Sequence, residues 1–505
     1  MRLVYVLFDS LNLNALSCYG DAPINTPNFD RFSKKAMTFQ NHYVGSLPCM
    51  PARRDMHTGR LSFMHRSWGP LEPFDNSMPQ LLSSAGTYSH LISDHFHYFE
   101  DGGTGYHTRY NTWDFIRGQE YDAWKAMVEP PIERFKAMYS DHQYNDESST
   151  RLQHQINSEF VHDETDFPGP KCFESAFQFL ETNRSADNWM LHLECFDPHE
   201  PFKAPERFKA ALKSDYSGPI LDWPKYGKVK ESPEEIAEIR GNYASLVAMC
   251  DEYFGRMLDY FDKHNMWDDT CLILTTDHGF LLSEHDWWGK NLMPYYDEIS
   301  HIPLIIHHPD MADKAGTSHD FLTQTADLMP TILDAFGVDI PREVTARSIF
   351  DMLEGGKQHT SVIYGMFGGP IGVSDGEYSY FIYPPDLKDE SLGEYTLMPA
   401  HLDGPFTGEE LATGQLSGPF DFTKGQQVLR VDALNSARRP GGYDAASAER
   451  FETSLFHNAS DPMQLKPIKN QEISDRLKNE IMTTLELHDT PSDYYNWMGF
   501  TQINN

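Results

Sequence analysis

The sequence predicts an α/β fold, in which a mostly parallel central sheet is flanked by helices and a smaller C-terminal α+β part follows. Short apolar runs of strand length recur through the first two thirds of the chain. A helical pattern at residues 236–261 separates two of these runs, as crossover helices separate parallel strands. At 505 residues the chain can also bury more than one core. We therefore expect a large domain over residues 1–365 and a smaller one over residues 366–505.

Five apolar runs have the length of buried strands, and polar residues follow each of them. The runs cover residues 3–8, 89–93, 189–196, 271–276 and 302–306. They are followed, in the same order, by Asp9-Ser10, Asp94-His95-Phe96-His97, Asp197-Pro198-His199-Glu200-Pro201, Asp277-His278-Gly279 and His307-His308-Pro309. Ligands of open α/β sheets bind beyond the carboxyl ends of the strands. A turn explains one such cluster, but several clusters predict a functional site at this edge of the sheet.

The rest of the chain has a different pattern. Residues 141–166 are polar and lack apolar periodicity, which predicts an inserted loop near the functional edge. In the C-terminal part, residues 361–367 and 377–383 have the character of strands. Residues 387–444 are rich in Gly, Pro and Asp, which predicts long loops, and residues 473–487 predict a final helix.

Two further segments have the apolar spacing of helices that face a core. They are residues 250–258 and 324–333. We expect both to be scaffold, and we expect Asp251 in the first of them to cap a helix or face solvent.

The composition excludes several classes of protein. Hydrophobic residues make up 40% of the chain and aromatic residues 13%, as in a globular protein. The formal net charge is -34 and no basic stripe is present, so we expect no nucleic-acid partner. Any anionic ligand must then be held by local positive groups. No apolar window reaches the length of a membrane span, so we expect no membrane partner.

Cysteine usage and the N-terminus indicate the cellular compartment. The six cysteines show no Cys-x-x-Cys spacing, and several of them lie in apolar stretches and are expected to be reduced core residues. The apolar run at residues 3–8 is too short for a signal peptide, so we expect a cytoplasmic protein. An exported form that has lost its signal is the alternative.

The segment Ser46-Leu47-Pro48-Cys49-Met50-Pro51-Ala52-Arg53-Arg54-Asp55-Met56-His57-Thr58-Gly59-Arg60 is the most informative part of the chain. Pro51 suits the first turn of a helix, so Cys49 is expected at the helix N-terminus, where free N–H groups attract anions. Arg53 follows one turn later on the same face. A nucleophile derived from a thiol, beside a guanidinium at a helix N-terminus, suits the binding of a tetrahedral oxyanion.

This Cys-x-Pro-x-Arg pattern followed by Thr-Gly-Arg resembles the signature of the type I, formylglycine-dependent sulfatases of the alkaline-phosphatase-like superfamily. In that family a maturation enzyme oxidises the cysteine to formylglycine, and the hydrated aldehyde, a gem-diol, attacks sulfur. The resemblance extends from Leu3 to about Gly337. It implies a sulfuric ester hydrolase that acts on an anionic sulfated substrate, and a partner that generates the formylglycine.

We expect the strand-end residues Asp9, Asp277 and His278 to bind a divalent metal, with Ser10 as a further ligand. The resemblance implies that Cys49, once converted, supplies an oxygen to the same ion, and that the ion is Ca²⁺. Ser10 replaces the second acid of the family's usual pair, so Mg²⁺ and Mn²⁺ remain open. The alternative for Asp9-Ser10 alone is a helix cap.

The resemblance also assigns the catalytic residues. Arg53 matches the arginine that contacts the nucleophile and the metal-site oxygens. Lys290 matches the lysine that neutralises the sulfate and the leaving oxygen, and the alternative is an exposed loop lysine. His199 matches the histidine that protonates the leaving group, and the alternative is a turn cap before Pro201.

The assignment near residue 95 departs from the family pattern. Many sulfatases carry Lys-x-His here, whereas this chain has Asp94-His95-Phe96-His97. We interpret His97 as the base that breaks down the hemiacetal and His95 as a group that binds the sulfate. In the alternative register Asp94 takes the place of the lysine.

The substrate is expected to be a sulfated carbohydrate. Aromatic residues near the predicted site, Trp288 among them, offer faces on which sugar rings stack. The identity of the sugar, the position of the sulfate, endo or exo action and the oligomeric state remain open. The alternative functions are a phosphonate or phosphate ester hydrolase of the same superfamily, a small-molecule aryl or alkyl sulfatase, and a non-catalytic sugar-binding relative with an unmodified cysteine.

Overall fold

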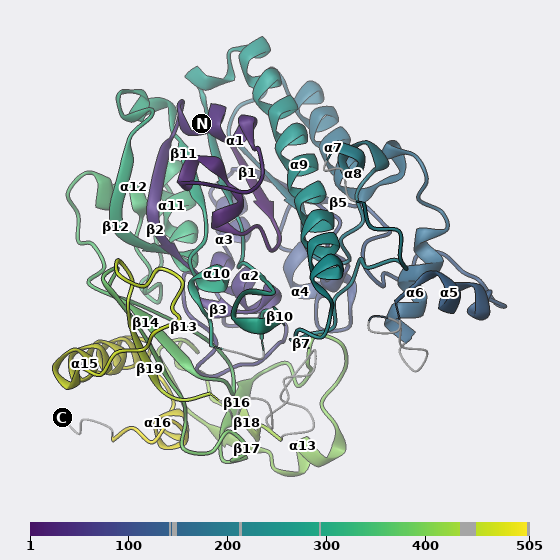
Figure 1. Ribbon diagram of the computed structural model, residues 1–505. Helices are drawn as coiled ribbons and strands as arrows, with labels where there is room; N and C mark the ends of the chain where they lie inside the picture. Colours follow the sequence, from purple (N-terminus) through teal and green to yellow (C-terminus); the bar gives the residue numbers. More distant parts are fainter. Residues whose placement is uncertain (141–142, 144–148, 212–214, 292–293, 435–450, 502–505) are drawn as a thin grey trace.

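The computed structural model describes residues 1–505 except 141–142, 144–148, 212–214, 292–293, 435–450 and 502–505 (Figure 1). Its centre is an eight-stranded sheet in the order β12-β2-β11-β8-β1-β6-β4-β5. These strands are β12 (Ser318–Gln324), β2 (Met37–Tyr43), β11 (Leu304–His307), β8 (Thr270–Thr275), β1 (Arg2–Phe8), β6 (Trp189–Cys195), β4 (Tyr88–Ser93) and β5 (Thr112–Phe115).

The sheet is mostly parallel, as the sequence predicts. Every neighbouring pair from β8 to β5 is parallel, and so is the pair of β12 with β2. The exception is β11, which is antiparallel to both β8 and β2. The run at residues 302–306 was expected to be parallel, and this expectation is wrong. The chain between β8 and β11 does not return to the opposite edge of the sheet through a long helix, so β11 starts at the edge where β8 ends.

Helices cover both faces of the sheet. One face carries α1 (Pro27–Ser33), α7 (Pro168–Thr182), α8 (Glu206–Ala211) and α9 (Pro233–His264), and the other carries α2 (Cys49–Thr58), α3 (Met78–Ser84), α11 (Leu328–Ala335) and α12 (Ile349–Leu353). The pattern predicted at residues 236–261 lies within α9, which begins with a capping box formed by Ser232 and Glu235.

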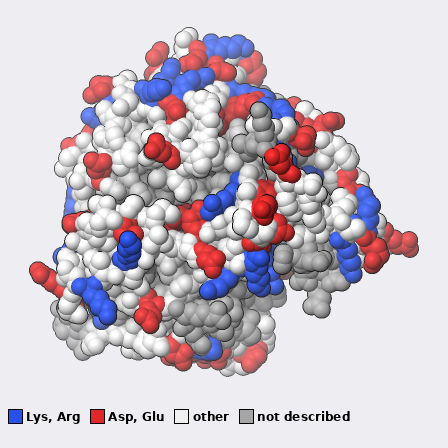
Figure 2. Space-filling model, in the orientation of Figure 1, with Lys and Arg blue, Asp and Glu red and all other residues white. Residues whose placement is uncertain are grey.

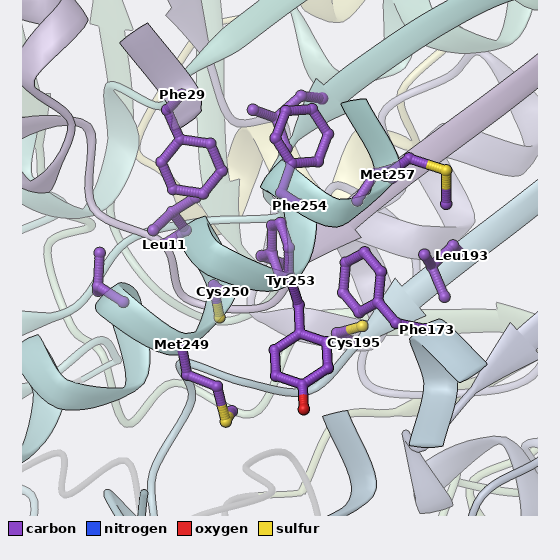
Figure 3. Packing of buried hydrophobic residues seen from close by; sticks show 14 of the residues in the cluster. Leu11, Phe29, Phe173, Leu193, Cys195, Met249, Cys250, Tyr253, Phe254 and Met257 are labelled. Carbon is purple, nitrogen blue, oxygen red and sulfur yellow. The ribbon is translucent and has the colours of Figure 1, made fainter. Parts of the chain in front are cut away.

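Two hydrophobic cores hold these layers together. Side chains of a strand point alternately to the two faces, and β1 shows this directly. Val4, Val6 and Phe8 pack in the core beneath α7 and α9, whereas Leu3, Tyr5 and Leu7 pack against α2 and α11. Figure 3 shows how Phe173 of α7 and Phe254 of α9 fill the first core. The central strands are therefore fixed on both faces, and their carboxyl ends are held in place.

The predicted insertion contains more regular structure than expected. Residues 141–166 were predicted to form a loop, but they include α6 (Ser149–Ser158), and α5 (Ile132–Met138) precedes them. Residues 141–142 and 144–148 of the predicted loop lie outside the described residues. A separate small sheet consists of three short strands, β7 (Gly227–Lys228), β10 (Trp287–Gly289) and β9 (Leu281–Leu282). Two short helices, α4 (Thr104–His107) and α10 (Asp297–Ser300), belong to the same part of the chain as the central sheet.

The C-terminal part is built on antiparallel strands. β13 (Val362–Met366), β14 (Ile371–Ser374), β15 (Tyr378–Ile382) and β19 (Ser454–His457) form one antiparallel sheet, which β3 (Ser46–Leu47) joins in parallel beside β13. β16 (Gly393–Thr396), β17 (Gln415–Ser417) and β18 (Val428–Asp432) form another sheet. The helices here are α13 (Gly408–Ala412), α15 (Gln471–Leu487) and α16 (Ser492–Trp497).

The two predicted C-terminal strands and the final helix are confirmed. The segment at residues 387–444, predicted to be loops, contains three strands and a helix, and its last ten residues lie outside the described residues. The boundary at residues 365 and 366 stays a prediction. No helix among the described residues is long and apolar enough to cross a membrane.

Candidate active site

The ends of β1 and β8 bring the predicted metal ligands together. The two strands are parallel neighbours, so they end at the same edge of the sheet. Asp9 directly follows β1, and Asp277 and His278 lie two and three residues beyond the end of β8. With Cys49 they form a buried group whose ligand atoms all lie within 4.8 Å of one another.

Cys49 is the first residue of α2, as the proline pattern predicts. Its Sγ lies 3.2 Å from Nε2 of His278 and 3.5 Å from Nζ of Lys290. The turn before it is fixed by Asp55, one and a half helical turns later, because its carboxylate accepts the backbone N–H and the hydroxyl of Ser46. The nucleophile position is thus held by its own helix.

The Thr-Gly-Arg part of the motif ends this helix. Gly59 has φ 63°, the left-handed conformation that favours glycine at a helix C-terminus. A Cβ at this position would also lie 2.7 Å from the side chain of Val344. Arg60 then donates to the backbone oxygens of Glu343 and His488, which ties the end of α2 to the C-terminal part of the chain.

Arg53 joins the carboxylates of the site. Its Nη2 donates to Oδ2 of Asp9 at 2.7 Å, and its Nη1 donates to Oδ2 of Asp277. Nε and Nη2 both donate to Oε1 of Glu194, at 3.0 and 2.9 Å. Burial alone would raise the pKa of Asp9, but the Arg53 guanidinium holds it well below its usual range. Asp9 is therefore ionised, as a metal ligand needs to be.

Glu194 is a site residue that the sequence analysis missed. It lies inside β6 and is fully buried, and its second oxygen accepts the hydroxyl of Tyr98 at 2.7 Å. An acidic residue within a buried strand whose other residues, apart from His192, are apolar was the available signal, because a buried acid needs a partner.

Lys290 and His199 form a buried pair on the other side of Cys49 from Arg53. Nζ of Lys290 lies 2.6 Å from Nε2 of His199, and both side chains are buried. Burial and then the charge of Lys290 hold the pKa of His199 well below its usual range. Burial would lower the pKa of Lys290, but Cys49, Glu200 and Asp9 raise it above its ordinary value. Lys290 is therefore the cation of this pair.

The two histidines near the end of β4 lie at different depths. His95 is fully buried, and its Nε2 lies 3.5 Å from Oδ2 of Asp9, beside the metal-ligand group. His97 lies further out, with its ring centroid 5.1 Å from that of His95. Nδ1 of His97 bonds with Oε2 of Glu100 at 2.7 Å. Asp94, the alternative to His95, instead accepts the backbone N–H of Phe196.

Ser10 lies at the site, whereas Trp288 does not offer a stacking face. Ser10 donates its hydroxyl to Oδ1 of Asp9 at 2.8 Å and its backbone N–H to Oδ1 of Asp277 at 3.1 Å. Trp288 is fully buried in the core beneath α9, and its indole N–H donates to Glu231. The prediction that Trp288 contacts substrate is corrected accordingly: β10 directs its ring into the core.

The donor set fits a divalent cation. Two carboxylates and one imidazole, with position 49 beside them, supply the hard and borderline donors that Ca²⁺, Mg²⁺ and Mn²⁺ accept. Ser10 is a neutral hydroxyl, so the site carries less negative charge than an all-acid set.

Comparisons with known proteins agree with this geometry. The family model described as Sulfatase matches residues 2–338. The chain belongs to the sulfatase family. This sulfatase is 28% identical over 376 residues to the multifunctional alkaline phosphatase superfamily protein PehA of Trinickia caryophylli, with 66% of this chain and 72% of that protein covered. It is 26% identical over 404 residues to the N-acetylglucosamine-6-O-sulfatase of Bacteroides thetaiotaomicron, with 70% and 71% covered.

Solved structures confirm the alkaline-phosphatase-like fold. A protein solved with its substrate D-glucosamine-2-N,6-O-disulfate matches the sulfatase with a TM-score of 0.65 and 17% identity, over 97% of this chain and 99% of that one. The phosphonate monoester hydrolase of Agrobacterium radiobacter matches with a TM-score of 0.64 and 16% identity, over 96% and 95%. At these identities the likeness concerns the fold alone.

Proposed function

We propose that this sulfatase releases sulfate from a sulfated carbohydrate, and that its nucleophile is formylglycine formed from Cys49. The observation that carries the proposal is the position of Cys49. It stands at a helix N-terminus, 3.5 Å from Lys290, with Arg53 one turn below on the same helix. A cysteine in this arrangement has cations on two sides and metal ligands on a third.

The chain's own residues have distinct roles in this proposal. Lys290 binds the sulfate and the leaving oxygen, because it is a buried cation directed at position 49. Arg53 fixes the carboxylates of Asp9 and Asp277, so their remaining oxygens keep one geometry. His199 handles the proton of the leaving alcohol, and His97 that of the hemiacetal.

The proposal also needs a divalent metal and the formylglycine group, and the site has residues that would hold them. Asp9, Asp277 and His278 would bind a divalent metal, with Ser10 beside them, and His95 would contact the sulfate. The metal would polarise a sulfate oxygen, and formylglycine would supply a hydrated aldehyde oxygen as nucleophile. A maturation enzyme must generate the formylglycine, because the sequence encodes cysteine.

The carbohydrate substrate is supported by the relatives and by the site's surroundings. Sulfatases named for N-acetylglucosamine 6-O-sulfate and for ulvan, from Bacteroides thetaiotaomicron and Formosa agariphila, are 26% and 24% identical to this chain. Tyr121 lies near the site, with its ring 6.0 Å from that of His97. This ring is half-buried and can contact a sugar.

Two measurements test the proposal together. The protein is produced with a formylglycine-generating enzyme, and mass spectrometry of the peptide around Cys49 should show sulfur replaced by oxygen with loss of two hydrogens. Sulfate release from a panel of sulfated oligosaccharides should depend on this conversion and be absent in Cys49→Ala. Undiminished sulfate release by Cys49→Ala would show that Cys49 is not the source of the nucleophile. Faster turnover of an aryl phosphonate than of every sulfate ester would show that sulfate ester hydrolysis is not the main reaction.

A further inference from the structure

Glu120 is a buried acid that the proposed mechanism does not use. Its side chain belongs to the segment after β5, and the residue is only 7% exposed. Among the described residues, no hydrogen-bond donor reaches its Oε2. Its backbone has φ 47°, in the left-handed region that residues other than glycine rarely adopt. A strained backbone and an unpaired buried carboxylate each cost free energy, and such costs concentrate at functional sites.

The segment that carries Glu120 is fixed on both sides. The preceding residue, Gln119, donates its Nε2 to Oδ2 of Asp94 at 3.0 Å, at the end of β4. The backbone oxygen of Asp122 accepts Nδ2 of Asn157, in α6, at 2.8 Å. The segment on both sides of Glu120 is therefore held by neighbouring elements before any ligand arrives.

This carboxylate lies at the proposed catalytic site. Oε2 of Glu120 is 3.7 Å from Nε2 of His97, longer than a hydrogen bond. Burial raises the pKa of Glu120 well above its usual range, and the charge of Glu200 adds to this, whereas Lys290 lowers it. His97 is the residue of the proposed site that Glu120 adjoins, so Glu120 lies at the margin of that site.

Glu200 is a second acid with spare acceptor capacity. It is 2% exposed, and its Oε1 accepts the hydroxyl of Tyr226. Its Oε2 lies 3.3 Å from Nδ1 of His199 but receives no hydrogen bond among the described residues. Burial raises the pKa of both acids, and each has an oxygen without a hydrogen-bond partner among the described residues. A cation with several donors beside these oxygens would favour their ionised form and fill their acceptor sites.

The surroundings also favour a cation. Burial raises the pKa of the phenol of Tyr121, the neighbour of Glu120 in the chain, and the charges of Glu120, Glu100 and Asp403 raise it further. The whole chain carries a net charge of -34, and acidic residues are spread over the face that Figure 2 shows. This field opposes a substrate with many sulfates and favours one that carries a positive charge beside its sulfate.

We propose that Glu120, with Glu200, binds an ammonium group of the substrate, so that the preferred substrate is a sulfated amino sugar with a free amine. The inference rests on the proposed function, because Lys290 must hold the sulfate of the same molecule. An ammonium provides three N–H donors and a positive charge, which match the two unpaired carboxylate oxygens. An N-acetylated amine has one donor and no charge, and its acyl group needs additional room.

The test compares matched substrates and matched variants. Glucosamine 3-O-sulfate and 6-O-sulfate are each assayed as the free amine and as the N-acetyl derivative, with the converted enzyme. We expect kcat/KM for the amine to exceed that for the N-acetyl form by about tenfold or more, as a charge-assisted hydrogen bond provides. Glu120→Gln should bring this ratio close to one. Glu129→Gln removes the same charge from an exposed position nearby and should leave the ratio unchanged.

The outcomes separate this inference from the proposed function. A wild-type ratio near one, or a ratio that Glu120→Gln leaves unchanged, would overturn the ammonium site. If no substrate releases sulfate, the proposed function fails, and calorimetric binding of glucosamine against N-acetylglucosamine then decides the ammonium site alone. If Glu120→Gln does not fold, Glu120→Asp is used, because it keeps the charge but withdraws it by one methylene and should reduce the ratio.

Discussion

Nζ of Lys290 lies 2.6 Å from Nε2 of His199, so the lysine donates a hydrogen bond to the imidazole. An ammonium has no acceptor, and Nε2 must therefore be unprotonated while Nδ1 carries the proton. Nδ1 in turn bonds with the backbone oxygen of Glu200. His199 is thus neutral at rest, and Lys290 carries the positive charge at this wall. Any proton for the leaving alcohol comes from this pair rather than from an imidazolium already present.

The Lys290–His199 pair predicts that the effect of replacing His199 on kcat depends on the leaving group of the substrate. His199→Gln should lower kcat for a sugar sulfate by about 100-fold or more, because an alkoxide leaves poorly without a proton. The loss for an aryl sulfate with an electron-withdrawing nitro group should be much smaller, since that phenolate leaves without protonation. Steady-state kinetics on both substrates measure the difference. Equal losses on the two would show that His199 does not supply the proton.

A second prediction concerns Glu194, which holds Arg53 from the side away from the metal ligands. Glu194→Gln keeps the shape of the side chain but removes the charge that pairs with Nε and Nη2 of Arg53. Outer partners of this kind typically change activity or metal affinity by about 10–100-fold. We expect kcat/KM to fall within this range while the circular dichroism spectrum is unchanged.

The control for Glu194 is a glutamate with an exposed ion pair. Glu181→Gln, on α7, loses a surface pair with Arg184 and should alter neither kcat/KM nor the circular dichroism spectrum. If Glu194→Gln behaves like this control, Arg53 is positioned by Asp9 and Asp277 alone.

The site residues that the sequence predicted share one property: each lies at the end of a strand or in a short local motif. Asp9, Asp277 and His278 follow apolar runs, and Cys49 and Arg53 are one helical turn apart. The spacing of residues in the sequence is therefore enough to predict them as site residues. The mostly parallel sheet followed from the same runs. These features depend on local sequence, which periodicity reports directly.

The residues that the sequence did not predict depend on tertiary contacts. Glu194 acts from inside a strand, where its role follows only from the Arg53 that packs across from it. Trp288 is an aromatic residue close to Lys290 in sequence, but the pleat of β10 directs its ring into the core. Glu120 lies in a segment without a motif, and its position depends on Gln119 and Asn157. The direction of β11 depends on the path of the intervening chain.

A third prediction uses Ser10, the neutral residue where sulfatases usually carry an acid. Ser10→Asp adds a third carboxylate beside Asp9 and Asp277. Without a divalent cation, the added repulsion should lower Tm, and added Ca²⁺ should raise Tm more in the variant than in the wild type. Thermal unfolding is measured after chelation and again with Ca²⁺, Mg²⁺ or Mn²⁺.

The matched control is Ser10→Ala, which loses the hydroxyl without adding charge. Its calcium response should be close to that of the wild type. A Ser10→Asp response no larger than that of Ser10→Ala would show that position 10 does not face the cation, and removal of Ser10 from the ligand group would follow.

The fourth prediction concerns Asp251 of α9, which the sequence marked as a cap. Its carboxylate accepts the backbone N–H groups of Asn28 and Phe29, at 2.9 and 2.8 Å, and so caps α1. Burial raises its pKa to about 6, although these hydrogen bonds oppose the shift. Because the folded protein holds this proton more tightly than the unfolded chain, the contribution of Asp251 to stability is fully present below about pH 4 and is lost as the pH rises through 6.

Asp251→Asn removes this titration but keeps an oxygen that can accept from the same N–H groups. The Tm of the wild type relative to the variant should therefore fall from about pH 4, the pKa of an unfolded aspartate, to about pH 6, the pKa of Asp251 in the folded protein. Sulfate release should be unaffected, since Asp251 lies on the α1 side of α9 and not at the catalytic edge. A Tm difference that stays constant with pH would mean that Asp251 is ionised throughout, so that the hydrogen bonds from α1 outweigh the cost of burying its charge.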